Sequence, residues 1–151
     1  MPARPAVPIL RAMDTIWGNV LSIDGRGVLL RGPSGSGKSD LALRLTDAGA
    51  HLVADDRVAV AREGNSLVAR APEALSGKME VRGIGIVSVP TVQRVALVLV
   101  VDLVPLEQVP RMPDPGRWSH LGVSVPLIAL NALEASAAAK VRLAVRQVST
   151  A

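Results

Sequence analysis

Residues 32–39 read Gly-Pro-Ser-Gly-Ser-Gly-Lys-Ser and satisfy the spacing G-x-x-x-x-G-K-[ST] without a gap. Glycines at positions 32, 35 and 37 would let backbone N–H groups turn inward around phosphate oxygens. A helix that starts here adds the positive end of its dipole, and its lysine reaches the β- and γ-phosphates. The final serine would place its hydroxyl on Mg²⁺. We therefore predict a nucleotide-binding loop made of Gly32, Pro33, Ser34, Gly35, Ser36, Gly37, Lys38 and Ser39.

Phosphoryl transfer also needs a carboxylate for the metal ion and a group that handles the acceptor. Asp102 ends the apolar run 95–101, and a long hydrophobic strand ending in Asp is a common place for a metal ligand. The adjacent pair Asp55 and Asp56 follows the apolar segment 51–54. Two neighbouring carboxylates can divide the work between metal and base, and their like charges raise one pKa. The residues alone leave both candidates open.

The elements around these residues predict an α/β domain with a mixed sheet. The segment 38–48 has the pattern of a helix with Leu41, Leu45 and Ala48 on its apolar face and Gly49 as its stop. Residues 136–148 predict a second helix, and Asp24-Gly25 predicts a hairpin turn. Strands are expected at 15–23, 27–31, 51–54, 57–61, 66–70, 85–89, 95–101 and 121–130, with loops at 71–85 and 105–116.

Composition limits the classes of protein that remain. The chain has 151 residues, which fits one domain at 15–151 after a Pro-rich, flexible tail at 1–14. It has no Cys, Phe or Tyr, so thiol chemistry is excluded and the core must consist of Val, Leu, Ile and Ala. Its 17 basic residues are scattered rather than clustered, which argues against nucleic acid as a partner. The longest apolar run has seven residues against the roughly 20 needed to cross a membrane, and residues 1–11 lack the apolar core of a signal peptide.

Three segments in this order and spacing resemble the catalytic domain of bacterial HPr kinase/phosphorylase. They are the loop 32–39, the stretch His-Leu-Val-Ala-Asp-Asp-Arg-Val at 51–58, and Glu-Val-Arg-Gly-Ile-Gly-Ile-Val at 80–87. The loop occurs in many families, whereas the second and third segments are much more specific in combination. The resemblance extends roughly from residue 15 to residue 146.

The resemblance implies a P-loop domain related to phosphoenolpyruvate carboxykinase that uses ATP and Mg²⁺ to phosphorylate a serine of the phosphocarrier protein HPr. Such an enzyme regulates carbohydrate metabolism from the cytoplasm and usually forms homo-oligomers, commonly hexamers. Carried over by position, Asp55 is the general base and Asp56 supports the metal together with Ser39. Lys38 keeps its catalytic role on the phosphates. Arg57, Glu80 and Arg82 would hold phosphate or the acceptor protein.

The sequence also departs from the pattern of this family. Trp17 stands where the family usually has a histidine, and the family's Gly-Arg-Asn stretch is replaced by 134–140, where Lys140 is the nearest basic residue. Forward transfer is therefore expected and phosphorolysis is not. A regulator that binds nucleotide without catalysis and a small-molecule kinase remain as alternatives. Trp17 and Trp118 are expected to be core or interface anchors.

Overall fold

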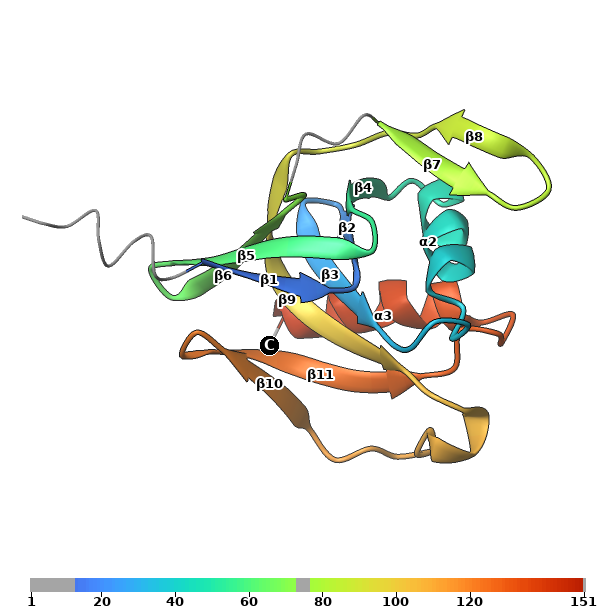
Figure 1. The fold of residues 1–151 in the computed structure, drawn as a ribbon. Coiled ribbons are helices and arrows are strands. Elements are labelled where there is room, and N and C mark those ends of the chain that lie inside the picture. The colour runs from blue at the N-terminus through green and yellow to red at the C-terminus, as the bar shows by residue number, and fades with distance from the viewer. Residues whose placement is uncertain (1–12, 73–76, 151) are drawn as a thin grey trace, which may run out of the picture.

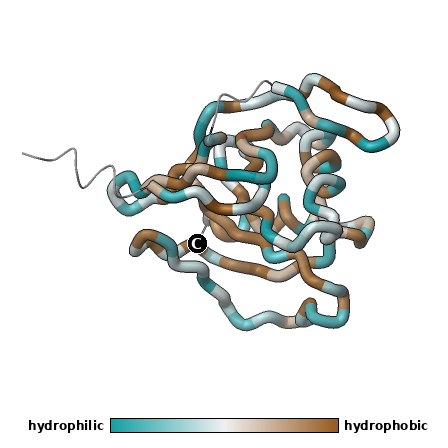
Figure 2. The backbone as a smooth tube through the Cα atoms, in the orientation of Figure 1, coloured by the Kyte–Doolittle hydropathy of each residue, from teal (hydrophilic) through white to brown (hydrophobic). Residues whose placement is uncertain are grey.

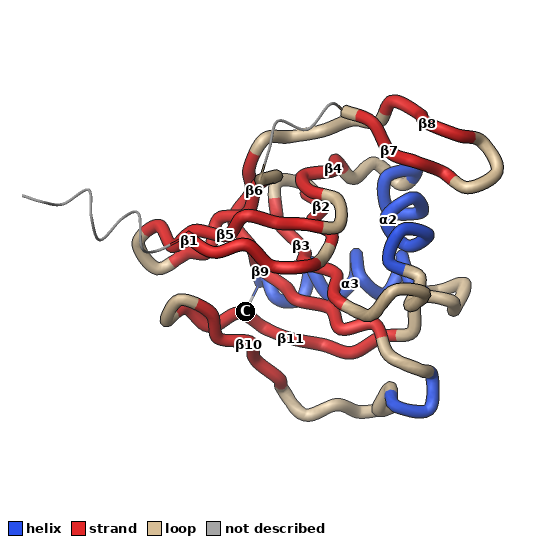
Figure 3. The backbone as a smooth tube through the Cα atoms, in the orientation of Figure 1, coloured by secondary structure: helices blue, strands red, loops and turns tan. Residues whose placement is uncertain are grey.

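The computed structural model describes residues 13–72 and 77–150, and strands outnumber helices in it (Figures 1 and 3). The first strands are β1 (Met13–Trp17), β2 (Asn19–Ile23) and β3 (Arg26–Arg31), followed by the helix α2 (Lys38–Asp47). After α2 come β4 (His51–Ala54), β5 (Arg57–Glu63), β6 (Ser66–Arg70), β7 (Lys78–Val81), β8 (Gly85–Ser88) and β9 (Arg94–Leu103). The chain ends with a short 3-10 helix η1 (Leu106–Gln108), β10 (Gly116–His120), β11 (Val123–Leu130) and α3 (Ala137–Thr150).

The long strand β9 organises a nine-stranded mixed sheet, which confirms the expected α/β class. The order of the main path is β1-β5-β6-β9-β3-β2-β4. Strand β9 pairs in parallel with β3 on one side. On its other side, its first residues pair with β6 and its last residues pair in parallel with β11. Strands β7 and β8 form a separate two-stranded hairpin near α2 (Figure 1).

Successive side chains of the central strands enter two different cores, because neighbouring residues of a strand point to opposite faces. On β3, Val28 and Leu30 face the core that α2 and α3 cover, whereas Leu29 faces the core beneath β5 and β6. Both faces of this strand are therefore buried, and the tube through these strands is mostly apolar (Figure 2). As expected, the buried apolar residues are Val, Leu, Ile and Ala, with Met79 as the one other type among those described.

The two-residue turn between β2 and β3 and the end of α2 lie where the sequence predicts them. Asp24 and Gly25 adopt φ values of 52° and 79°, as the predicted hairpin turn between β2 and β3 requires. At the end of α2, Gly49 has a φ of 106° and donates to Thr46 O, while Ala50 donates to Leu45 O. These two bonds define a Schellman motif, so the stop predicted at Gly49 is confirmed. The apolar face differs by one residue: Ala48 is exposed at the cap and Ala42 is buried instead.

Five expectations about the strands and the tail are corrected. The segment 15–23 is two strands, because Gly18 has a φ of 153° and a side chain there would lie 2.8 Å from Leu30 O. Strand β7 lies inside the expected loop 71–85, and β10 was not expected. Leu121 and Gly122 form the turn before β11 rather than its start. The tail ends earlier than residue 14, since β1 starts at Met13 and pairs with β5; residues 1–12 lie outside the described residues.

Within the described residues 13–72 and 77–150, no helix is long and apolar enough to span a membrane.

Candidate active site

The predicted phosphate loop connects the end of β3 to the first turn of α2. Gly35 and Gly37 have φ values of 84° and 93°, a region that glycine reaches without strain. Gly37 is the N-cap of α2 and offers no side chain to the first helical N–H groups. The free N–H groups of the first turn and the positive end of the helix dipole are therefore available to an anion bound at the loop.

The loop leaves no room for side chains at two of its glycines. A Cβ atom at Gly32 would lie 2.6 Å from Ser36 Oγ, and one at Gly37 would lie 2.8 Å from the Cβ of Ala132. The Ser36 hydroxyl is buried and has no hydrogen-bond partner among the described residues. Lys38 Nζ contacts Gly32 O and lies 3.3 Å from Pro33 O, so its ammonium group is held against the loop itself.

The acidic pair forms a tight, strained turn after β4. Asp56 has a φ of 71°, and Arg57 N donates across it to Asp55 O at 2.8 Å, which is the geometry of a γ-turn. Two further bonds hold the turn: Asp56 N donates to Asn19 Oδ1 at 2.9 Å, and Gly18 N donates to Asp56 O at 2.9 Å. Positive φ at a residue other than glycine is costly and is often found at functional sites.

The electrostatic surroundings of Asp55 favour its protonated form. Partial desolvation is the largest cause that raises the pKa of Asp55 above its ordinary value, although the residue remains exposed to solvent by its surface area. The negative charges of Asp56 and then Glu80 raise this pKa further. A carboxylate with a raised pKa is a better proton acceptor, as the role of a general base requires.

A cleft of about 970 Å³ brings most of the predicted site residues together. It is lined by residues of the phosphate loop, by Asp55 and Asp56, and by Glu80 and Arg82 of the β7–β8 hairpin. Ser36 and Arg57 do not line the cleft. Sequence reasoning missed several residues that do line it, which are Trp17, Asn19, Asp40, Leu43, Met79 and Val81.

Two of these additional residues have informative environments. Asn19 is 1% exposed, and its Nδ2 atom has no hydrogen-bond partner among the described residues. It is therefore a buried donor at the edge of the cleft, next to the acidic turn. Trp17 is 69% exposed, so it does not anchor a core, and its alternative role as an interface anchor stays a prediction. Trp118 is only partly exposed and packs against the second core, in agreement with its expected role.

Asp102, the competing acidic candidate, does not line the cleft. It lies opposite Arg31 in the parallel register of β3 and β9. The Arg31 guanidinium donates to both of its carboxylate oxygens, at 2.8 and 3.0 Å. Arg31 also lies over the ring of Trp118, 5.4 Å from its centroid. The carboxylate at the end of β9 is thus already paired within the sheet.

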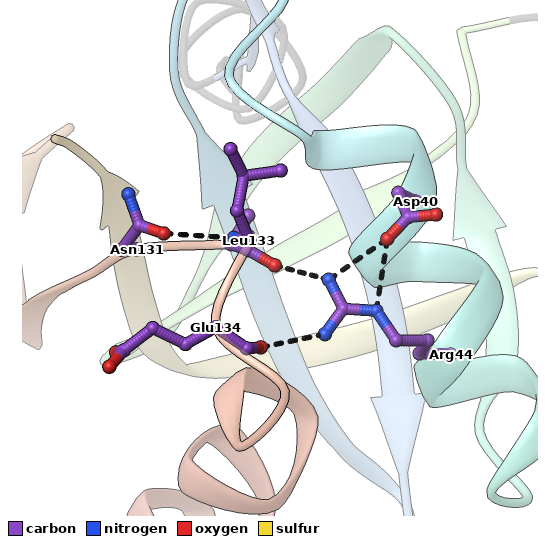
Figure 4. A network of polar contacts seen from close by, with 6 residues as sticks. Asp40, Arg44, Asn131, Leu133 and Glu134 are labelled. Carbon is purple, nitrogen blue, oxygen red and sulfur yellow. Dashed lines mark hydrogen bonds and ion pairs between the residues drawn. The ribbon is translucent and has the colours of Figure 1, made fainter. Parts of the chain in front are cut away.

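A clamp next to the first turns of α2 holds the chain between β11 and α3 against this helix (Figure 4). Arg44 of α2 donates to Ala132 O and, at 3.1 Å, to Glu134 O, and it pairs with Asp40 at 3.0 Å. Ala132 is the residue that packs on Gly37. Arg44 therefore connects the phosphate loop to a segment about 90 residues later in the chain.

Comparisons with known proteins agree with this geometry. A family profile described as "HPr Serine kinase C-terminal domain" matches residues 9–140. The HPr kinase/phosphorylase of Limosilactobacillus reuteri is 40% identical over 133 residues, which cover 80% of this chain and 42% of that protein. The corresponding protein of Lactobacillus acidophilus is 48% identical over 81 residues, covering 53% of this chain and 25% of the relative.

Similarity to a solved structure extends over nearly the whole chain. The structure of the Hpr(Ser) kinase/phosphatase from Coxiella burnetii has a TM-score of 0.79 and 31% sequence identity, and the match covers 91% of this chain and 97% of that one. The chain spans about two fifths of the length of the curated relatives it matches first. The profile match, the sequence identity and the shared fold together show that this chain belongs to the HPr serine kinase family, represented here by its C-terminal domain.

Proposed function

We propose that this domain is a kinase that transfers the γ-phosphoryl group of ATP to a serine of HPr. The observation that carries the proposal is the cleft, whose lining includes both the phosphate loop and Asp55 with its raised pKa. The names of the relatives, HPr kinase/phosphorylase, support HPr as the acceptor. The family resemblance further supports a cytoplasmic homo-oligomer, commonly a hexamer in this family.

The residues of the cleft fit a magnesium nucleotide. Gly35 and Gly37, with their positive φ values, and the uncapped first turn of α2 suit phosphate oxygens. Ser39 and Asp56 would hold Mg²⁺, which prefers oxygen ligands and usually takes only one or two protein carboxylates beside the phosphates. When bound, the metal ion neutralises the charge that develops on the transferred phosphoryl group.

The chain's own residues account for the rest of the reaction. Lys38 moves from its carbonyl partners onto the phosphates, and Asp55 accepts the proton of the serine hydroxyl. The serine oxygen forms a bond to the γ-phosphorus, and the bond from that phosphorus to the β–γ bridging oxygen breaks, so ADP leaves. Arg82 and Glu80, which also line the cleft, would hold the acceptor. Arg57, which lies outside the cleft, would contact the acceptor protein rather than the phosphates.

We further propose that phosphorolysis is slow. A second phosphate needs cationic groups beyond the phosphate loop. Lys140, the nearest basic residue in the altered segment, pairs with Glu134 at 2.9 Å and does not line the cleft. Excess inorganic phosphate added to phosphoserine-HPr should therefore release HPr and pyrophosphate much more slowly than the forward reaction phosphorylates HPr. Equal rates would show that another group supplies the charge.

The main test follows transfer of labelled phosphate from ATP to HPr, with HPr that lacks its acceptor serine as the control. Lys38→Ala should lose ATP binding in calorimetric titration while remaining folded. Asp55→Asn should bind ATP normally and lose transfer by about 10²-fold or more, the scale of a lost general base. Tight ATP binding with no transfer of phosphate to HPr would contradict the proposed kinase activity. It would favour a regulator, or a small-molecule kinase if a metabolite became labelled.

A further inference from the structure

Trp17 is a large apolar side chain left open at the edge of a polar cleft. It is the last residue of the edge strand β1, lines the cleft and is 69% exposed. Its backbone is paired with Arg57 in the register of β1 and β5. The Arg57 guanidinium lies over the indole ring, 5.8 Å from its centroid, so a cation–π contact holds the ring in place.

The backbone places Trp17 beside the acidic turn. The next residue, Gly18, donates its N–H to Asp56 O at 2.9 Å, and Asn19 accepts a hydrogen bond from Asp56 N. The two residues that follow Trp17 are thus bonded to the same turn that carries the proposed base.

This position lies on the acceptor side of the reaction. In phosphoryl transfer the attacking and leaving oxygens are roughly in line, and the base contacts the attacking oxygen. In the proposed function the phosphate loop holds the nucleotide and Asp55 contacts the attacking oxygen, and both line the same cleft as Trp17. Trp17 lines this cleft and is followed by two residues that are bonded to Asp56, so we place it on the side of the acceptor rather than at the phosphate loop.

We propose that Trp17, backed by Arg57, is a specificity-determining subsite that receives an apolar side chain flanking the acceptor serine. This inference rests on the proposed function and adds to it the chemistry of the acceptor segment. The phosphates and Mg²⁺ offer no apolar group, whereas an exposed tryptophan gains most by contact with an aliphatic or aromatic side chain. The subsite does not take part in the chemical step.

Steady-state kinetics with HPr test the subsite. Trp17→Ala should raise KM for HPr about tenfold or more, the scale of a lost tryptophan anchor, and leave KM for ATP within about twofold. Trp17→Phe should retain most of the affinity. Met112→Ala is the matched control, because Met112 is 90% exposed and lies outside the cleft. An unchanged KM for HPr in Trp17→Ala would overturn the inference.

A double-mutant cycle identifies the contact on the acceptor. Each apolar residue that flanks the acceptor serine of HPr is replaced in turn by alanine. One of these changes should raise KM for the parent enzyme and have little effect on Trp17→Ala, because the two partners contact each other. Additive effects at every flanking position would also contradict the subsite.

Fluorescence separates failure of this inference from failure of the proposed function. The chain has two tryptophans, so Trp118→Phe leaves Trp17 as the sole reporter. HPr should shift the emission of Trp17 and protect it from quenching by acrylamide, whereas a non-hydrolysable ATP analogue with Mg²⁺ should not. If HPr is phosphorylated without a change in Trp17 fluorescence, or if the nucleotide alone changes this fluorescence, the subsite is refuted while the proposed kinase activity is retained. If HPr neither binds nor is phosphorylated, the proposed function itself fails.

Discussion

Replacing Arg44 with methionine tests whether the clamp between α2 and the chain after β11 stabilises the phosphate loop. Methionine keeps much of the side-chain length and removes the guanidinium. The Ala132 and Glu134 carbonyls then lose a charged donor, and Asp40 loses its partner. Because the loop rests on Ala132 through Gly37, the change should reach the nucleotide site as well as the global fold.

The magnitude follows from the number and exposure of these contacts. Hydrogen bonds to a charged group contribute about 1.5–3 kcal/mol each. The Arg44 side chain is 29% exposed, so water can replace part of what is lost. An exposed i,i+4 ion pair adds only about 0.3–0.5 kcal/mol. Together these values predict a loss of about 2–4 kcal/mol in the free energy of unfolding, or roughly 5–15 °C in Tm for a domain of this size.

Urea and thermal unfolding, followed by circular dichroism without nucleotide, measure this loss. Asp40→Asn is the matched control, because it removes the ion pair and keeps both carbonyl contacts; it should cost less than about 0.5 kcal/mol. Arg44→Lys should lose more stability than Asp40→Asn and less than the methionine variant, since lysine keeps the charge without the planar guanidinium group. ATP should bind the methionine variant more weakly than the parent. A methionine variant as stable as Asp40→Asn would mean that water satisfies the two carbonyls and that the clamp has no role.

Three further predictions concern the two acidic candidates. Glu80→Gln removes one of the charges that raise the pKa of Asp55, so the acidic limb of the pH profile of kcat/KM should move to lower pH; an upward shift would contradict the assignment. Because the pKa of Asp55 is raised by folding, its ionisation destabilises the folded state. Asp55→Asn should therefore be more stable than the parent at pH 7, and the difference should vanish in unfolding experiments below about pH 4, where both are neutral. Asp102→Asn should weaken its ion pair with Arg31 and cost about 1 kcal/mol of stability, while kcat stays within about twofold; a collapse of kcat would restore Asp102 as the metal ligand.

The parts of the fold that sequence reasoning predicted are those with local causes. The Asp24-Gly25 turn and the Gly49 stop depend on positive φ values, which restrict the choice of residue at a single position. The phosphate loop has a fixed spacing between its functional residues for the same reason. Strand β7 had a local signal too, because Lys-Met-Glu-Val alternates exposed and buried residues, but the charges and nearby glycines suggested a loop.

The choice between the acidic candidates could not be made from local pattern. Asp102 does end a long apolar strand, as the general rule requires. Its partner Arg31 lies 71 residues earlier in the chain, and only the register of β3 and β9 brings them together. The exposure of Trp17 also depends on pairing that the local sequence does not reveal. The chain breaks at Gly18, so β1 pairs with β5 at the edge of the sheet, whereas β2 lies among the buried strands.

The break at Gly18 thus connects features that would otherwise look unrelated. It releases β1 to pair with β5, which exposes Trp17, and its N–H secures the carbonyl of Asp56. Strand β2, which starts one residue later, supplies Asn19 to hold the amide of the same residue. The positive φ of Asp56 can persist because both of its backbone polar groups are bound from this short segment. The proposed base and the proposed acceptor subsite therefore form one structural unit, in which a glycine between two strands positions both.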